Sequence, residues 1–171
     1  PADHALFEPP STDVLDFVFQ EGHRAENIPF QFIENHIYLP VRIGDSTRLG
    51  GRYAGAGATV VDRAYAEELG MKVEGQMKGQ GAANTVDVAF GQLPAFSLPG
   101  IQFGSQNVAV IDIGWLFEKM LGFEVVGILG YDFLSRLVTK VDYGNELLSF
   151  YHHKHFAYEG PGEIIDAPIS Q

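Results

Sequence analysis

Cysteine is absent from the 171-residue sequence, which excludes a disulfide scaffold, a thiolate zinc site and a cysteine nucleophile. Basic side chains are scarce, because 11 Lys and Arg stand against 22 Asp and Glu and leave a formal net charge of −11. A nucleic acid partner needs a basic surface that neutralises phosphates, so we expect none. The sequence also lacks an apolar run of the ~18–20 residues that a membrane-spanning helix requires.

What is present indicates one folded domain. Apolar residues make up 46% of the chain and charged residues only 19%, with 13 Phe, a composition that argues against disorder. The sequence begins at Pro1 rather than Met, as we expect for a processed or excised piece. The compartment stays unknown, although the lack of cysteine weakly favours an exported or periplasmic protein.

Many short strands and few helices are predicted along the chain. Residues 28–43 alternate apolar and polar side chains around Glu34-Asn35, as a β-hairpin does. Residues 62–69 and 115–121 are the two clear helix candidates, each closed by a glycine. Residues 138–151 are expected to form a last hairpin, with Tyr143-Gly144-Asn145 near its turn. We divide the chain into an N-terminal arm with a first strand (1–20), a β-rich lobe (21–158) and a C-terminal tail (159–171). The fold class is therefore mainly β, without βαβ alternation.

Three segments, taken in order, resemble the retropepsin-like aspartyl protease family and especially its bacterial branch. Residues 28–43 are similar to its opening hairpin, and residues 55–69 (GAGATVVDRAYAEEL) to the segment that follows its catalytic Asp-Thr-Gly-Ala motif. Residues 126–137 (VGILGYDFLSRL) resemble its second signature, which is the most specific of the three. The resemblance, over about residues 28–152, implies a closed β-barrel lobe with two or three short helices.

The family implies a chemistry that this sequence lacks. In retropepsins each of two lobes supplies one Asp, and the close pair shares a proton and activates a water molecule. Aligned with that motif, Tyr53 stands where the Asp should be and Ala54 where Thr or Ser should be, before Gly55 and Ala56. No Asp or Glu occurs between residues 46 and 61 in any register. We therefore predict no catalytic residue and no cofactor.

The same resemblance suggests a binding surface. Residues 75–84 correspond by position to the family's flap, a hairpin that closes over a bound peptide, although an ordinary exposed loop explains the segment equally well. Gly130 and Asp132 are predicted to brace the degenerate loop. The residues expected to contact a peptide or protein partner belong to that loop and to the flap: Tyr53, Gly55, Gly57, Gly79, Gly81 and Ala82.

Other polar residues have plainer interpretations. Asp45 is expected in a hairpin turn, Asp62 as the cap of the first helix and Asp112 as the cap of the second. His153 and His155 would share one face of a strand, beside His152. Because no third ligand is evident near them, we predict a solvated strand end and no metal site.

The sequence thus predicts a retropepsin-like lobe that kept the fold and lost catalysis. It would bind a protein or peptide, as an accessory subunit of a larger assembly or as a homodimer. The aromatic content, including Trp115, Phe117 and Phe123, favours such a partner. One alternative is an aspartic endopeptidase that acts as a two-lobe dimer. Another is one lobe of a longer chain.

Overall fold

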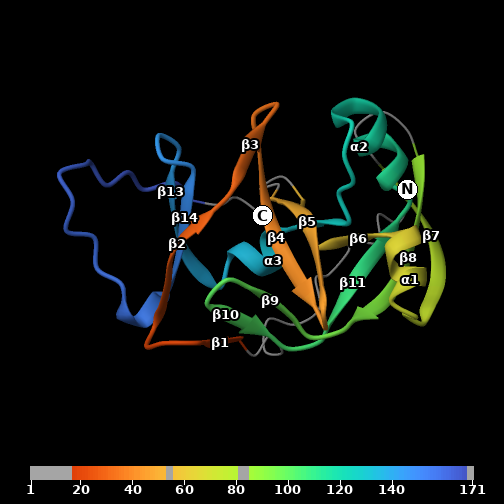
Figure 1. Ribbon diagram of the computed structural model, residues 1–171, viewed down its shortest axis with the longest axis horizontal. Helices are drawn as coiled ribbons and strands as arrows, with labels where there is room; N and C mark the ends of the chain where they lie inside the picture. Colours follow the sequence, from red (N-terminus) through yellow and green to blue (C-terminus); the bar gives the residue numbers. More distant parts are fainter. Residues whose placement is uncertain (1–16, 53–55, 81–84, 169–171) are drawn as a thin grey trace.

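The computed structural model describes residues 17–52, 56–80 and 85–168. The described strands form two sheets, accompanied by three short helices and a 3₁₀ turn (Figure 1). The strands are β1 (Phe17–Phe19), β2 (Arg24–Pro29), β3 (Gln31–Ile33), β4 (His36–Ile43), β5 (Ser46–Arg52), β6 (Val60–Asp62), β7 (Val73–Gln80), β8 (Thr85–Leu93), β9 (Phe96–Leu98), β10 (Ile101–Phe103), β11 (Gln106–Ile111), β12 (Gly127–Leu129), β13 (Leu137–Asp142) and β14 (Leu147–His152). The helices are α1 (Arg63–Glu68), α2 (Gly114–Leu121) and α3 (Tyr131–Leu134), and the 3₁₀ turn is η2 (His153–His155).

The larger sheet has 11 strands in the order β1-β10-β9-β4-β5-β12-β6-β11-β8-β7, with β3 paired to β4 beside this path. Strands β1 and β7 stand at opposite ends of this order, so the sheet is open rather than a closed barrel. Only one residue pair, Arg42 with Ser97, joins β4 to β9. The mainly β fold with short helices agrees with the sequence, but the predicted closure is not confirmed.

A second sheet combines both ends of the chain. Strand β14 pairs with β13 and with β2, all antiparallel. The β13–β14 hairpin predicted around residues 143–145 is confirmed, and Glu146 completes its turn with a φ of 53°. Asn145 binds the Asp142 carboxylate through its backbone N–H at 3.0 Å and its side-chain amide at 2.9 Å. These bonds lower the pKa of Asp142.

The hairpin predicted over residues 28–43 is confirmed only in part. Glu34 and Asn35 form its turn, with φ values of 50° and 63°, and β3 pairs with the start of β4. The chain before Phe30 belongs to the other sheet, because β2 pairs with β14 and the Phe30 N–H donates to the carbonyl of Glu146. Alternation alone does not reveal that one apolar run crosses from one sheet to the next.

Of the two helix caps predicted from the sequence, the first is confirmed and the second was wrong. Asp62 caps α1 as predicted, accepting from the backbone N–H of Tyr65 at 3.4 Å. Asp112 does not cap α2, whose N-cap is Ile113. The Asp62 carboxylate instead accepts from the N–H groups of Ile113 at 3.1 Å and Gly114 at 2.7 Å. One buried carboxylate therefore serves the start of both helices.

The core lies between the two sheets and is rich in aromatic rings. Phe133 of α3 is 1% exposed. The centroid of its ring lies 4.8 Å from that of Phe103 in the larger sheet and 5.8 Å from that of Phe150 in the smaller one. Figure 1 shows α3 between the two sheets, whereas α1 and α2 lie together at the far end of the larger one. None of the described helices is long and apolar enough to cross a membrane.

Candidate functional site

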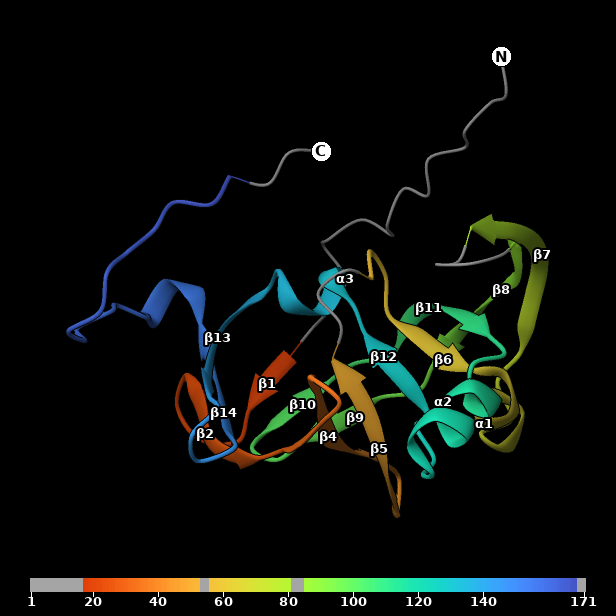
Figure 2. The ribbon, with the colours of Figure 1, turned by 90° about the horizontal axis from the view of Figure 1, so that it is seen from above.

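The candidate site is built where three strands of the larger sheet meet. Strand β12 lies between β5 and β6, parallel to β5 and antiparallel to β6. The chain leaves β5 at Arg52 and re-enters the sheet at Val60, and residues 56–59 of the connection lie beside the end of β12 (Figure 2). Tyr53, Ala54 and Gly55 fall outside the described residues. The described part of this loop runs from Ala56 to Thr59.

Hydrogen bonds tie this loop to the start of α3. The Thr59 hydroxyl donates to Asp132 Oδ1 at 2.8 Å and accepts from the backbone N–H of Gly130 at 3.2 Å. Asp132 Oδ1 also accepts from the N–H of Phe133 at 2.8 Å, and the N–H of Tyr131 donates to the carbonyl of Ala56 at 2.8 Å. Thr59 and Asp132 are only 2% and 8% exposed. The network is buried and satisfies its polar groups, which a buried loop requires.

Gly130 is required by close packing rather than by its backbone angle. A Cβ atom built on Gly130 would stand 2.4 Å from the carbonyl carbon of Ala58. Gly127 is confined in the same way, since its Cβ would lie 2.5 Å from the carbonyl oxygen of Val60. The Gly-Ile-Leu-Gly stretch of the second signature therefore lets two backbones touch.

The described residues of the predicted partner surface differ in their surroundings. Gly57 is exposed, and nothing lies within 4 Å of the position that its Cβ would take. Gly79 lies in β7, opposite Val86 of β8. Gly81 and Ala82 fall outside the described residues. Gly57 thus marks an open place on the loop, and the β7–β8 hairpin stands at the position where the sequence predicts the flap.

The flap is a regular antiparallel hairpin of β7 and β8. Its register runs from Val73 opposite Gly91 to Gln80 opposite Thr85, with a bulge between Glu74 and Met77. Gly75 has a φ of 76° within this bulge, a conformation that favours glycine. Among the described strands β7 pairs only with β8, so its outer edge is free.

Carboxylates close to the loop in the sequence already have other partners. Asp132 is bound by Thr59, and Asp62 is 6% exposed and bound by three backbone N–H groups. Asp45 lies in the β4–β5 turn with a fully exposed side chain, 3.8 Å from Arg42. None of these three carboxylates is a free acid that faces the loop.

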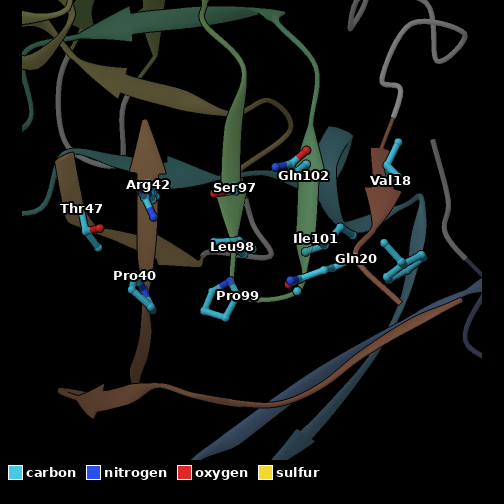
Figure 3. A pocket seen from close by; sticks show the side chains of 12 residues that line it. Val18, Gln20, Pro40, Arg42, Thr47, Ser97, Leu98, Pro99, Ile101 and Gln102 are labelled. Carbon is cyan, nitrogen blue, oxygen red and sulfur yellow. The ribbon is translucent and has the colours of Figure 1, made fainter. Parts of the chain in front are cut away.

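A cavity of about 470 Å³ lies elsewhere on the molecule (Figure 3). Its lining comes from β1, β4, β9 and β10, including Val18, Arg42 and Gln102, and does not include the loop at residues 56–59. The cavity is open, and its lining contains no carboxylate. We therefore do not connect it with the candidate site.

Sequence reasoning missed Thr59, whose hydroxyl links the loop to α3. A Thr three positions after the Gly55-Ala56 pair has no distinctive pattern, because only the fold brings Asp132 to it. The prediction that His153 and His155 share one strand face was wrong, since both lie in the 3₁₀ turn η2. The His155 ring instead stacks on His23, at a centroid distance of 3.7 Å.

Comparison with known proteins agrees with this geometry. The sequence model of the aspartyl protease family, described as "Aspartyl protease", matches residues 54–133. That range contains residues 54–59 of the loop, the β7–β8 hairpin and the first four residues of the Gly-Tyr-Asp-Phe-Leu signature. The match covers less than half of the chain and is a similarity to that family.

A solved structure shows the same fold. A retropepsin-like aspartic protease from Rickettsia conorii superposes with a TM-score of 0.51 at 16% identity, covering 79% of this chain and 98% of that one. The retroviral protease-like domain of Ddi1 from Leishmania major gives a TM-score of 0.44 at 18% identity, covering 71% of this chain and 98% of that one. EIAV protease, solved in complex with the inhibitor HBY-793, gives a TM-score of 0.43 at 21% identity, covering 60% of this chain and 88% of that one. No curated protein matches the sequence.

Proposed function

We propose that this chain is a catalytically defective member of the bacterial branch of the retropepsin-like proteases, and that it binds an extended segment of a protein partner without cleaving it. The observation that carries the proposal is the absence of any Asp or Glu between residues 46 and 61, next to a brace whose packing is complete. Retaining Gly130 and Asp132 keeps the loop's shape. Losing the carboxylate removes the group that activates water.

The residue at the Asp position cannot restore this chemistry. Tyr53 carries a phenol with a reference pKa near 10, so it is protonated at the acidic pH where an aspartyl dyad works. Asp132 and Asp62 cannot substitute either, because each holds backbone N–H groups that would lose their acceptor if the carboxylate turned away. A water molecule at this loop would therefore meet no general base among the described side chains.

The free edge of β7 and the open surface at Gly57 support binding of an extended peptide. An exposed strand edge offers unpaired N–H and C=O groups, with which a peptide can form main-chain hydrogen bonds. At Gly57 nothing within 4 Å of the Cβ position obstructs a backbone that approaches from outside. The proposed contact set is the one predicted from the sequence, and Gly57 and Gly79 are its described members.

A cleavage assay tests the loss of catalysis. The purified chain, incubated with unfolded casein between pH 3 and 6, should give no cleavage that a statine-type inhibitor blocks. A variant that restores the motif, Tyr53→Asp with Ala54→Thr, serves as the matched comparison. Inhibitable cleavage by the natural chain would contradict the proposal. Asp132→Asn should abolish such cleavage only by unfolding the chain.

Substitution at Gly57 tests the binding surface. Gly57→Val adds a side chain that meets nothing in the chain, so the free energy of unfolding should stay within about 0.5 kcal/mol. Affinity for fluorescein-labelled unfolded casein should fall at least fivefold, as measured by anisotropy at pH 7. Gly144→Ala in the β13–β14 turn, where a Cβ makes only an ordinary contact, is the control and should bind as the natural chain does. Equal affinities for the two variants would remove the loop from the proposed surface.

The second candidate is an aspartic endopeptidase active as a dimer, favoured by the aspartyl protease match at residues 54–133. Retropepsin active sites take one Asp from each of two lobes, so a homodimer of this chain would hold two Tyr53 side chains instead. This candidate therefore needs a catalytic acid from a different chain. Activity that appears only after a second, Asp-bearing lobe is added would favour it over the binding role.

A further inference from the structure

Four of the six histidines of the chain meet at one end of the smaller sheet. His152 ends β14, His153 and His155 form η2, and His23 lies in the turn that precedes β2. The backbone N–H of His152 donates to the carbonyl of His23 at 2.9 Å, which joins two points of the chain that are far apart in the sequence. We call these four residues the histidine cluster.

The rings of the histidine cluster stack instead of pointing to a common centre. His23 and His155 lie face to face, with centroids 3.7 Å apart and planes 5° apart. The ring centroid of His152 lies 4.8 Å from that of His153, with an angle of 17° between the planes. It lies 5.3 Å from the centroid of His155, with an angle of 65°. Within the described part of the chain, no three His, Asp or Glu side chains are arranged to hold a metal ion. The packing suits neutral imidazoles, because two stacked imidazolium rings would repel each other.

Other charges around the cluster do little to offset such repulsion. The pKa of His152 is lowered, first by burial and then by His153, His155, His23 and Lys154. An adjacent cavity of about 660 Å³ is lined by the charged side chains of Arg24, Glu26, Lys140 and Glu159. Glu26 is paired with Arg24 at 3.0 Å, so it is not free to neutralise an imidazolium.

The cluster fixes the point where the chain leaves the smaller sheet. Beyond η2, Phe156 packs on Tyr151 at 4.9 Å, and residues 157–160 extend along the cavity rather than filling it. The side chains of residues 157–168 are exposed. The stack of His155 on His23 is thus a principal contact that holds residues 153–160 against the turn before β2 of the smaller sheet.

We propose that the histidine cluster is a pH-sensitive latch, in which protonation of the stacked imidazoles releases residues 153–160 from the smaller sheet. Imidazole titrates near pH 6.5, inside the physiological range. Because the fold depresses the pKa of His152, this residue binds a proton more readily once the segment is released. The closed form is therefore fully stabilised above pH 6.5 and loses that stabilisation as the pH falls below it. Release would uncover Tyr151 and the face of β2 that borders the cavity.

Two ring-preserving substitutions separate stacking from charge. His155→Phe and His23→Phe each keep an aromatic ring in the stack but cannot take up a proton. Both should keep residues 153–160 ordered down to pH 5. His36→Phe, at the start of β4 and away from the cluster, is the matched control and should behave as the natural chain does.

The measurement is NMR of the full chain between pH 7.5 and 5, in the presence of EDTA. Backbone amides of residues 153–160 should move toward random-coil shifts with a midpoint below pH 6.5, while those of β4 and β5 stay fixed. His152 should titrate over the same range. The latch would be overturned if the natural chain kept residues 153–160 ordered at pH 5. It would also be overturned if the segment were released in His155→Phe and His23→Phe at the same pH as in His36→Phe.

Discussion

At the scale of single residues, the candidate site depends on how closely two backbones approach. Thr59 contributes one hydroxyl that serves as donor to Asp132 and as acceptor from Gly130. A hydroxyl can fill both roles because it has one hydrogen and two lone pairs. Gly130, which lies beside Thr59 in this junction, has no side chain and so lets the two backbones approach closely. The loop therefore keeps its shape through two small residues, neither of which is a catalytic group.

Gly130→Ala tests this packing directly. The added Cβ would stand 2.4 Å from the carbonyl carbon of Ala58 and 2.8 Å from the N of Thr59, both backbone atoms that cannot turn aside. We expect a loss of about 2–3 kcal/mol in the free energy of unfolding, measured by urea denaturation. Gly57→Ala, which meets nothing within 4 Å, is the control and should change stability little. Equal stabilities for the two variants would show that the backbones do not touch as described.

At the scale of elements, one carboxylate organises two helices. Asp62 ends β6, caps α1 and accepts the first N–H groups of α2, so it fixes where both helices begin. Arg48 of β5 holds the same region from the side, contacting Glu68 at 2.7 Å and Glu124 at 2.6 Å. The hydrogen bond to Glu124 and the charges of both acids raise the pKa of Arg48.

Asp62→Ala is expected to cost far more than Asp112→Ala. It leaves the N–H groups of Tyr65, Ile113 and Gly114 without their acceptor, and the loss should reach about 2–3 kcal/mol. Asp112 is exposed and is not the cap of α2, so its substitution should fall within about 0.5 kcal/mol. Thermal unfolding followed by circular dichroism checks both variants. A larger loss for Asp112→Ala would restore the cap that the sequence suggested.

Prediction from sequence worked best where the signal is local. The Asp62 cap, the Glu34-Asn35 turn and the β13–β14 hairpin each depend on a few neighbouring residues, and all three are confirmed. The second cap was wrong because Asp62 comes from another element, 51 positions from Ile113 along the chain. The His23–His155 stack could not be foreseen for the same reason. Contacts between distant segments leave no pattern in either segment alone.

The candidate site was predictable in part. The resemblance predicted that Gly130 and Asp132 brace the loop, and in the structure Gly130 packs against Ala58 while Asp132 accepts from Thr59. The missing acid was visible in the sequence alone. Whether Asp62 or Asp132 could replace it was not, because that depends on which backbone N–H groups each carboxylate already holds. Open or closed sheet edges are likewise a property of the assembled fold.

At the scale of the whole molecule, a few phenylalanines hold the two sheets together. Phe133 contacts Phe103 and Phe150, which come from different sheets, while Phe96 stacks on Phe103 at 4.9 Å. Helix α2 contributes no buried residue, and Met120 on it is 69% exposed. Stability should therefore be concentrated around α3 and be nearly independent of the apolar side chains of α2.

Phe133→Ala and Met120→Ala measure this contrast. Removing the ring of Phe133 opens a cavity where the two sheets meet and should cost about 3–5 kcal/mol. Met120→Ala removes a side chain that the fold leaves in solvent, so its cost should be below about 0.5 kcal/mol. Urea denaturation followed by Tyr fluorescence reports both sheets, and a single transition in each variant is expected because Phe133 joins them. If Phe133→Ala instead gave two separate transitions, the two sheets would be independent folding units. The loop, which depends on α3, would then unfold with the smaller sheet.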